Sequence, residues 1–313
     1  MPFFNYTEAI SFNAAVKKNH WHDTLPYQVY ESFPDLLIDP ASPDINMRKS
    51  FAFATWSLQK SLTGIPPEGE DGKLGKGTAE AAHQAFNELD INAGYMVIGR
   101  NRVKANLSDR LILRPFDAPG GLDLHKEGDF RKSPGRKPRL LVLHWGGLTL
   151  LSCFNALASR GLSSHGGFSP KLFQQWLDFS HIAWHAGYVN GYSIGLDICQ
   201  SPEIKYQKFY ADRGEDLKIV INETGRGAKK VLQLNPDVAK DVLVLTTSLC
   251  KILDIPMQGP TGPNTMGSIS DSVYHGVMDK SFLNSPHCRG IIGHHHVAAS
   301  KWDIACWWKE IFV

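Results

Sequence analysis

The stretch Arg139-Leu-Leu-Val-Leu-His144-Trp-Gly-Gly147 contains a continuous aliphatic run that is followed by a histidine and, one residue later, by two glycines. Apolar runs without polar alternation are typical of strands that are buried on both faces. A histidine at the end of such a strand, beside a glycine turn, is well placed to bind a ligand. The stretch therefore predicts a buried central strand with a functional residue at its end.

A second strand is predicted at residues 193–199, where apolar and polar residues alternate. Ile194, Leu196 and Ile198 share one face of this strand. Asp197 lies on the opposite face with the small polar residues, and therefore points away from the apolar layer.

A helix is predicted to begin at residues 235–237, because Asn-Pro-Asp combines an N-cap residue, a first-turn proline and an acid that the helix dipole favours. Its apolar stripe consists of Val238, Val242, Leu245, Leu249 and Ile252. Since strands and helices interleave over residues 139–313, we expect a layered α/β or α+β domain there.

The N-terminal part of the chain is predicted to be helical. Phe51, Ala54, Leu58 and Leu62 recur on one face of a helix that Gly64 can end. A second helix, capped by Thr78, is expected to bury Ala82, Ala85, Phe86 and Leu89. The glycine-rich residues 71–78 would form the tight loop between the two helices.

The domain boundary is expected between these two parts. Residues 118–138 are dense in glycine, proline and charge and poor in periodic apolar residues, as in a linker. We therefore expect a helical domain over residues 1–117, a linker over 118–138 and the layered domain over 139–313.

Composition narrows the functional class. The 313 residues are 42% hydrophobic and 20% charged, which is typical of a globular protein. The net charge of +2 gives no support to a nucleic-acid partner. No apolar run approaches the roughly 20 residues that span a bilayer, so we expect no stable membrane insertion. The first residues lack the pattern of a signal peptide, which predicts a protein made in the cytoplasm without one.

The candidate metal ligands are histidines and a carboxylate. The five cysteines form no CxxC pair, so neither a disulfide framework nor an all-cysteine zinc site is indicated. Zinc in catalytic sites prefers three protein ligands drawn from imidazole nitrogens, carboxylates and thiolates, with a fourth position open to water. His144, His294 and Asp303 together offer such a set.

Four motifs of the C-terminal half occur in one order: LLVLHWGG, SSHGGFSP, IAWHAGYVNGYSIGLDI and GHHHVAASKWD. In residue types and order they resemble the zinc-dependent N-acetylmuramoyl-L-alanine amidases of the amidase_2 type, which share their fold with peptidoglycan recognition proteins. The resemblance implies an α/β fold with a mixed β-sheet flanked by helices and one Zn²⁺ per chain. It implies His144, His294 and Asp303 as the zinc ligands, with His294 fitting better than His295 or His296.

The resemblance also implies roles for other residues. Bound zinc can lower the pKa of a water to about 7, Asp197 would act as the general base, and Lys301 would stabilise the oxyanion. The substrate-binding residues would be Trp184, His185, Asn190 and His165.

The chain departs from the family pattern in two places. Asp197 stands where the family usually has glutamate, and the span from His294 to Lys301 is one residue shorter than in many members. Cys306, three residues beyond Asp303, is an alternative ligand.

A second resemblance lies in the N-terminal part. The pieces Trp56-Ser-Leu-Gln59, Asp71-Gly-Lys-Leu-Gly-Lys-Gly-Thr78, Ala82 and Phe86 resemble the peptidoglycan-binding domain 1 family, with a motif core at about residues 46–95. The match departs at Asn87, where the family usually has glutamine. This resemblance implies a three-helix bundle with bacterial peptidoglycan as its partner.

Together the two resemblances imply a hydrolase that cuts the amide between N-acetylmuramic acid and L-alanine of the stem peptide. It would act in the periplasm or cell wall, reached through a holin, as for a phage endolysin, or through a specialised secretion apparatus. Two alternatives are a recognition protein that binds peptidoglycan without cleaving it and a cytoplasmic recycling amidase that acts on soluble anhydro-muropeptides.

Overall fold

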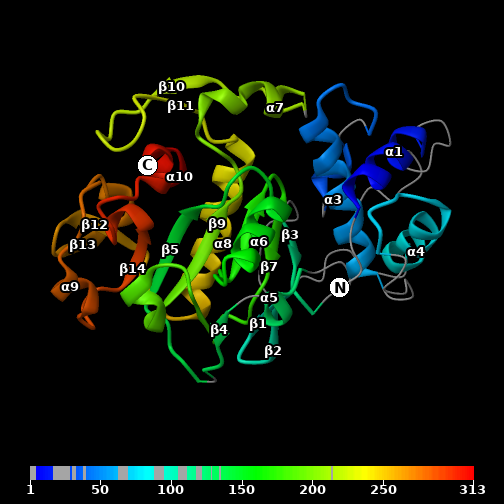
Figure 1. The fold of residues 1–313 in the computed structure, drawn as a ribbon. Helices are drawn as coiled ribbons and strands as arrows, with labels where there is room; N and C mark the ends of the chain where they lie inside the picture. Colours follow the sequence, from blue (N-terminus) through cyan, green and yellow to red (C-terminus); the bar gives the residue numbers. More distant parts are fainter. Residues whose placement is uncertain are drawn as a thin grey trace. The chain divides into compact units, whose positions relative to one another are not determined.

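The structure is a computed structural model that describes residues 5–16, 29, 33–37, 40–62, 70–87, 95–104, 111–117, 122–127, 129–133, 135–212 and 214–313. The chain divides into two compact units, residues 1–93 with 116–122 and residues 94–115 with 123–313. The second unit contains the main sheet (Figure 1). Within the described ranges, no helix combines the length and the apolar character that crossing a bilayer requires.

The second unit is built on a six-stranded mixed sheet in the order β14-β5-β9-β6-β7-β3. Four strands are parallel to one another, and β7 pairs with β6 in the antiparallel sense. The strands are β3 (Ile112–Arg114), β5 (Leu140–Trp145), β6 (Gly166–Ser169), β7 (Leu172–Gln175), β9 (Ser193–Ile198) and β14 (Gly290–Gly293). The predicted strands at residues 139–144 and 193–199 are thus confirmed, within a mixed and mostly parallel sheet.

One face of the sheet carries the main apolar core. Leu143 of β5 and Leu196 of β9 are cross-strand partners that belong to this core. Helices α8 (Pro236–Ile252) and α10 (Trp308–Phe312) contribute to the same cluster. The predicted start of α8 is confirmed, because the Asn235 side chain accepts a hydrogen bond of 2.9 Å from the backbone N–H of Asp237.

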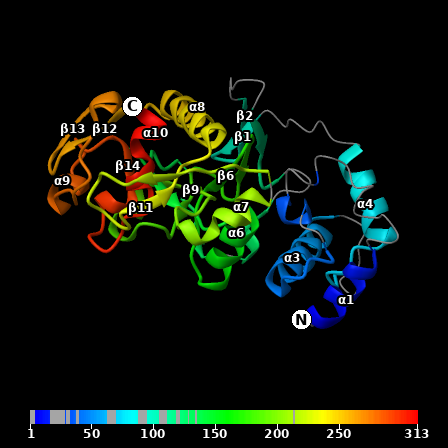
Figure 2. The same ribbon diagram turned by 90° about the horizontal axis from the view of Figure 1, so that it is seen from above.

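The opposite face carries Leu140, Val142 and Ile292 in a separate apolar cluster, together with the polar side chains that follow them along the strands. Helix α6 (Leu150–Ser159) begins with a capping box at Thr149. Figure 2 shows α6 and α8 on opposite sides of the sheet. The sheet is therefore a central layer flanked by helices, as the family resemblance implies.

Shorter elements surround this sheet. They are β1 (Tyr95–Ile98), β2 (Asn101–Lys104), α5 (Leu124–Glu127), β4 (Phe130–Arg131), β8 (Ile182–Ala183), α7 (Gln207–Ala211), β10 (Ile219–Ile221), β11 (Lys230–Leu232), β12 (Gln258–Gly262), β13 (Thr265–Ser268) and α9 (Lys280–Asn284). Five 3₁₀ helices that bear on the site or its surroundings are η5 (Gly187–Tyr192), η6 (Ile204–Tyr206), η7 (Ile269–Asp271), η8 (His294–His296) and η9 (Asp303–Trp307).

The predicted boundaries at residues 117 and 138 differ from the structure. Strand β3 pairs with β7 of the main sheet, and Leu113 belongs to the main core. Within the expected linker, β4 pairs with β8, and the Arg136 guanidinium donates hydrogen bonds of 2.9 Å to Phe179 O and 2.8 Å to Ser193 O. Residues 95–104 and 111–115 and much of the expected linker therefore belong to the α/β unit, because β3 and β4 pair with strands that lie far away in the sequence.

In the first unit the described helices are α1 (Tyr6–Val16), η3 (Pro34–Leu37), α3 (Ile45–Ser61) and α4 (Lys76–Asn87). Helix α3 buries Phe51, Ala54 and Leu58, which confirms the predicted stripe. Helix α4 begins at Lys76, so the prediction that Thr78 caps it is wrong, although Ala82 is buried as expected. The positions of Gly64 and Leu89 and the side chains of Ala85 and Phe86 lie outside the described residues.

The described residues 71–78, at the start of α4 and directly before it, are held by the buried side chain of Gln59. The Gln59 side chain accepts a hydrogen bond of 2.8 Å from Gly72 N–H and donates one of 3.1 Å to Lys73 O. The Asp71 carboxylate and the Thr78 hydroxyl are also within 3.1 Å of its amide nitrogen. Gln59 and residues 71–78 are therefore joined by hydrogen bonds, which gives both motifs a structural role.

Replacing Gln59 with leucine should destabilise residues 71–78, because the Gly72 N–H would be buried without an acceptor. A buried N–H group without an acceptor is expected to lower the local stability by about 1–3 kcal/mol. Hydrogen–deuterium exchange of residues 71–78 measures it, with the exposed Asn46→Leu on the same helix as control. Unchanged protection in Gln59→Leu would contradict the assigned role.

Candidate metal centre

The register of three parallel strands brings the candidate ligands to one edge of the sheet. His144 of β5 is the cross-strand partner of Asp197 of β9. On the other side of β5, Leu143 pairs with Gly293, so His294 follows β14 directly beside His144. Ligands in open α/β sheets bind at this carboxyl edge of parallel strands. The site therefore follows from strand pairing, although the residues lie far apart in sequence.

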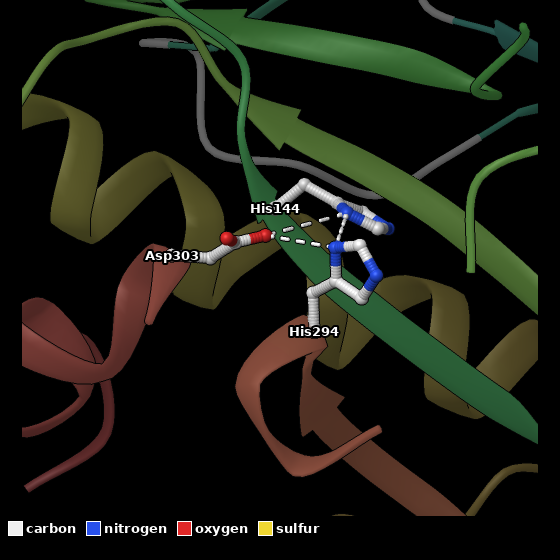
Figure 3. Close-up of side chains that lie close together, drawn as sticks. All are labelled: His144, His294 and Asp303. Carbon is white, nitrogen blue, oxygen red and sulfur yellow. Dashed lines mark hydrogen bonds and ion pairs between the residues drawn. The ribbon is translucent and has the colours of Figure 1, made fainter. Parts of the chain in front are cut away.

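Three side chains converge at this edge (Figure 3). His294 Nδ1 lies 2.9 Å from Asp303 Oδ2 and 3.1 Å from His144 Nδ1. The distance between His144 Nδ1 and Asp303 Oδ2 is 3.7 Å. All three potential ligand atoms lie within 4.8 Å of one another, so the group could hold a metal ion.

Burial and mutual contacts set the protonation of this group. Burial opposes ionisation of Asp303, but its contacts with the His144 and His294 rings outweigh burial and hold the pKa of Asp303 well below its usual range. Burial also lowers the pKa of His294, against a hydrogen bond with Asp303 that raises it. At neutral pH an ionised Asp303 and a neutral His294 result, and these are the forms that bind metals.

Behind His144, the side chains of His185 and Ser193 form a chain of hydrogen bonds, here called the relay, that fixes the tautomer of the His144 ring. The Ser193 hydroxyl donates its one hydrogen to Val189 O at 2.8 Å, so it accepts from His185 Nε2–H at 3.1 Å. Burial lowers the pKa of His185 well below its usual range, so the His185 ring is neutral. His185 Nδ1 then accepts from His144 Nε2–H at 2.8 Å. The relay leaves the lone pair of His144 Nδ1 directed at His294 and Asp303, as a metal ligand requires.

The relay depends on Gly195. A Cβ atom at this position would lie 2.6 Å from the His185 ring, so only glycine lets the ring lie against β9. Sequence reasoning did not assign a role to Ser193 or Gly195. The available signal was their place on the same polar face of β9 as Asp197.

Asp197 lies on the strand next to His144 and is 6% exposed. Burial raises the pKa of its carboxyl group, while the charge of His144 and a hydrogen bond with Ser164 act in the opposite direction. A backbone turn closes over this carboxyl, because a Cβ atom on Gly146 would lie 3.2 Å from Asp197 Oδ1. A buried carboxyl with a raised pKa beside a candidate metal centre is suited to proton transfer.

The predicted substrate-binding residues lie in different environments. Trp184 is 37% exposed and is available to a ligand. His165 is fully buried and accepts a hydrogen bond of 3.0 Å from Gly195 N–H. Asn190 is buried, and its side-chain oxygen accepts hydrogen bonds from the backbone of His185 and Ala186 at 3.2 and 2.7 Å. In this structure His165 and Asn190 are buried and His185 is half-buried, and all three form hydrogen bonds within the protein.

The other candidate site residues near the C-terminus lie outside the group formed by His144, His294 and Asp303. His296 is used structurally, because it accepts from Gly293 N–H at 2.9 Å and donates to Tyr274 O at 2.7 Å. Among the described residues, Cys306 does not belong to the candidate metal-binding group, and its thiol lies 3.9 Å from the backbone oxygen of Asp303. Lys301 is exposed two residues before Asp303. Of the three consecutive histidines, His294 is therefore the one that joins the group.

Neither a protein-family model nor a curated protein matches the chain. Two imidazole nitrogens and a carboxylate oxygen from three separate segments converge within 4.8 Å, and this convergence indicates a candidate metal centre. The relay behind His144 adds a second, independent feature that free surface histidines lack.

Replacing His185 with alanine should weaken metal binding about 10–100-fold, since outer partners of ligating histidines contribute about that much. The expected cause is loss of the Nε2–H partner that fixes the tautomer of His144. Competition of the protein with a chromophoric chelator for Zn²⁺ measures the affinity. The exposed His287→Ala serves as the matched control, and equal affinities in the two variants would refute the relay.

Proposed function

We propose that the protein is a zinc-dependent amidase that cleaves the bond between N-acetylmuramic acid and the L-alanine of the peptidoglycan stem peptide. The observation that carries the proposal is the convergence of His144, His294 and Asp303, with Asp197 on the adjacent strand. The four ordered motifs of the C-terminal half supply the substrate class, because they are the pieces that resemble the amidase_2 family.

The donor set suits zinc. Two neutral imidazole nitrogens and one carboxylate oxygen make a common catalytic zinc site, which keeps a further position open. When bound, Zn²⁺ supplies a Lewis acid that polarises a carbonyl and lowers the pKa of water. His144, His294 and Asp303 would hold the ion, and the relay through His185 and Ser193 would keep His144 in the required tautomer.

Asp197 is the proposed proton carrier. Its raised pKa brings the carboxyl group nearer to the pH at which it can both accept and release a proton. The carboxylate would take a proton from the attacking water and pass it to the nitrogen of the departing L-alanine. Aspartate in place of the family's glutamate is one methylene shorter, and the proposal requires that β9 holds it close enough.

Two exposed side chains would contact the substrate. The Lys301 ammonium group is proposed to stabilise the negative charge that develops on the carbonyl oxygen. The exposed Trp184 ring would pack against the glycan or the stem peptide. Asn190, His185 and His165 keep supporting roles in this proposal, because their polar atoms are already used within the protein.

The N-terminal helices are proposed to form a small bundle that binds peptidoglycan and holds the enzyme on its insoluble substrate. The support is the motif core at residues 46–95, whose Gln59 and 71–78 pieces form one hydrogen-bonded unit. Action on the cell wall, after passage through a holin or a specialised secretion apparatus, belongs to the same proposal.

Digestion of purified sacculi, followed by mass spectrometry of the soluble products, tests the function. With added Zn²⁺ we expect free stem peptides that begin with L-alanine, and with a chelator we expect none. Sacculi that bind the protein but stay uncut in both conditions would favour a recognition protein. Release of glycan fragments with attached peptides would contradict the bond assignment.

Replacing Asp197 with asparagine should reduce cleavage about 10²–10⁴-fold, which is the usual contribution of general acid–base catalysis. Zinc should remain bound at one ion per chain, because Asp197 is outside the ligand group. The exposed Asp216→Asn is the control for both assays. Loss of zinc in Asp197→Asn would show that Asp197 is a ligand, and full activity would remove it from the mechanism.

A further inference from the structure

The loop of residues 295–302 joins His294 to Asp303 and is held from outside by an arginine of a separate hairpin. The Arg226 guanidinium Nη2 lies 2.6 Å from Lys301 O and 3.1 Å from Ala299 O. The oxygens of His295 and Ala298 are farther from it, at 3.4 and 3.5 Å. Because Nη2 carries two hydrogens, the two shorter contacts are its main hydrogen bonds. They bind the part of the loop directly before Asp303.

Residues 222–229, here called the hairpin tip, join β10 to β11 and present Arg226 in a fixed conformation. Asn222 Nδ2 donates to Ala228 O at 2.9 Å, and Asn222 Oδ1 accepts from Thr224 Oγ1–H at 2.7 Å. Thr224 Oγ1 accepts in turn from Arg226 N–H at 3.2 Å. Gly225 and Gly227 flank Arg226 with φ values of +70° and +76°, which favour glycine. The hairpin tip is therefore organised by its own side chains.

A second contact of the hairpin tip reaches the same loop through aromatic rings. Gly227 packs so closely on Trp302 that a Cβ atom would lie 2.4 Å from the ring. Trp302 lies in turn beside Trp145, with ring centroids 5.6 Å apart. Trp145 directly follows His144, and Trp302 directly precedes Asp303. The hairpin tip thus contacts the loop between two of the metal-binding residues and, through Trp302, the segment of the third.

We propose that the hairpin tip is a clamp that sets the affinity of the metal centre, with Arg226 as its main positioning residue. Arg226 and Gly227 fix the carbonyls and the ring of the loop, so His294 and Asp303 converge before the ion arrives. Without the clamp, the loop samples arrangements in which the two ligands are apart, and binding must select the converged one. The inference rests on the proposed zinc centre but not on which bond the protein cleaves.

The positive charge of Arg226 and its hydrogen bonds to the loop have opposite expected effects on Zn²⁺ affinity, so the two can be distinguished. A guanidinium close to a cation site repels the cation, so removal of its charge alone should strengthen Zn²⁺ binding. The clamp predicts the opposite sign, because the loss of two hydrogen bonds to the loop outweighs the relief of repulsion. Lysine keeps the charge but lacks the planar fork, so it should replace arginine only in part.

Zinc competition titrations on the full chain test the clamp. We expect Arg226→Ala to bind Zn²⁺ about 10–100-fold more weakly than the unsubstituted protein and Arg226→Lys to lie between the two. The matched control is Arg160→Ala, an exposed arginine at the end of α6, which should bind as the unsubstituted protein does. Thermal unfolding of the metal-free proteins separates loss of the site from loss of the fold.

Gly227→Ala is the second variant, because it disturbs Trp302 while leaving Arg226 in place. We expect it to weaken zinc binding and to change the tryptophan fluorescence. Unchanged or stronger zinc binding in Arg226→Ala would overturn the clamp, as would failure of the unsubstituted protein to bind zinc. Stoichiometric zinc binding without cleavage of sacculi would overturn the proposed amidase function and leave the clamp standing.

Discussion

The parallel pairing of β5 with β9 on one side and β14 on the other is the constraint on which the site depends. It places His144, Asp197 and His294 in one row at the carboxyl edge of the sheet. A one-residue change of register would turn a side chain to the opposite face, where the main apolar core packs. The apolar residues that alternate with these polar ones therefore hold the chemistry in place as well as the fold.

Burial, together with neighbouring side chains, then sets the protonation of the titratable groups at this edge of the sheet. Burial lowers the pKa values of His185 and His294. Asp303 stays ionised because its contacts with His144 and His294 lower its pKa. Asp197 lies in the same row but has a raised pKa because its burial is less well compensated. The pKa values of the two carboxyl groups are thus shifted in opposite directions. The lowered pKa of Asp303 suits metal binding, and the raised pKa of Asp197 suits proton transfer.

Local patterns predicted the local elements. The cap at Asn235, the alternation in β9 and the apolar run in β5 are each encoded within a few residues, and the structure confirms them. The cap at Thr78 was wrong, because its hydroxyl lies beside Gln59 in the loop contact instead. The domain boundary differed because β3 is defined by pairing with β7, about 60 positions later.

The ordered motifs of the sequence identify the trio His144, His294 and Asp303, but no motif identifies the supporting residues Ser193, Gly195 and Arg226. The contact of Arg226 with Lys301 O spans 75 positions of sequence, and no periodicity or motif indicates it. Ser193 is a common residue on a polar strand face, and only the direction of its hydrogen bonds shows that it orients His185. Such roles depend on which distant segments meet.

X-ray absorption spectroscopy at the zinc edge, on protein loaded with one equivalent of Zn²⁺, tests the central claim most directly. The account predicts stoichiometric binding with nitrogen and oxygen scatterers only, including two imidazole rings, and a loss of one ring in His144→Ala. A sulfur scatterer would show that a cysteine, such as Cys306, is a ligand. That result, or zinc bound in less than stoichiometric amount, would contradict the centre formed by His144, His294 and Asp303.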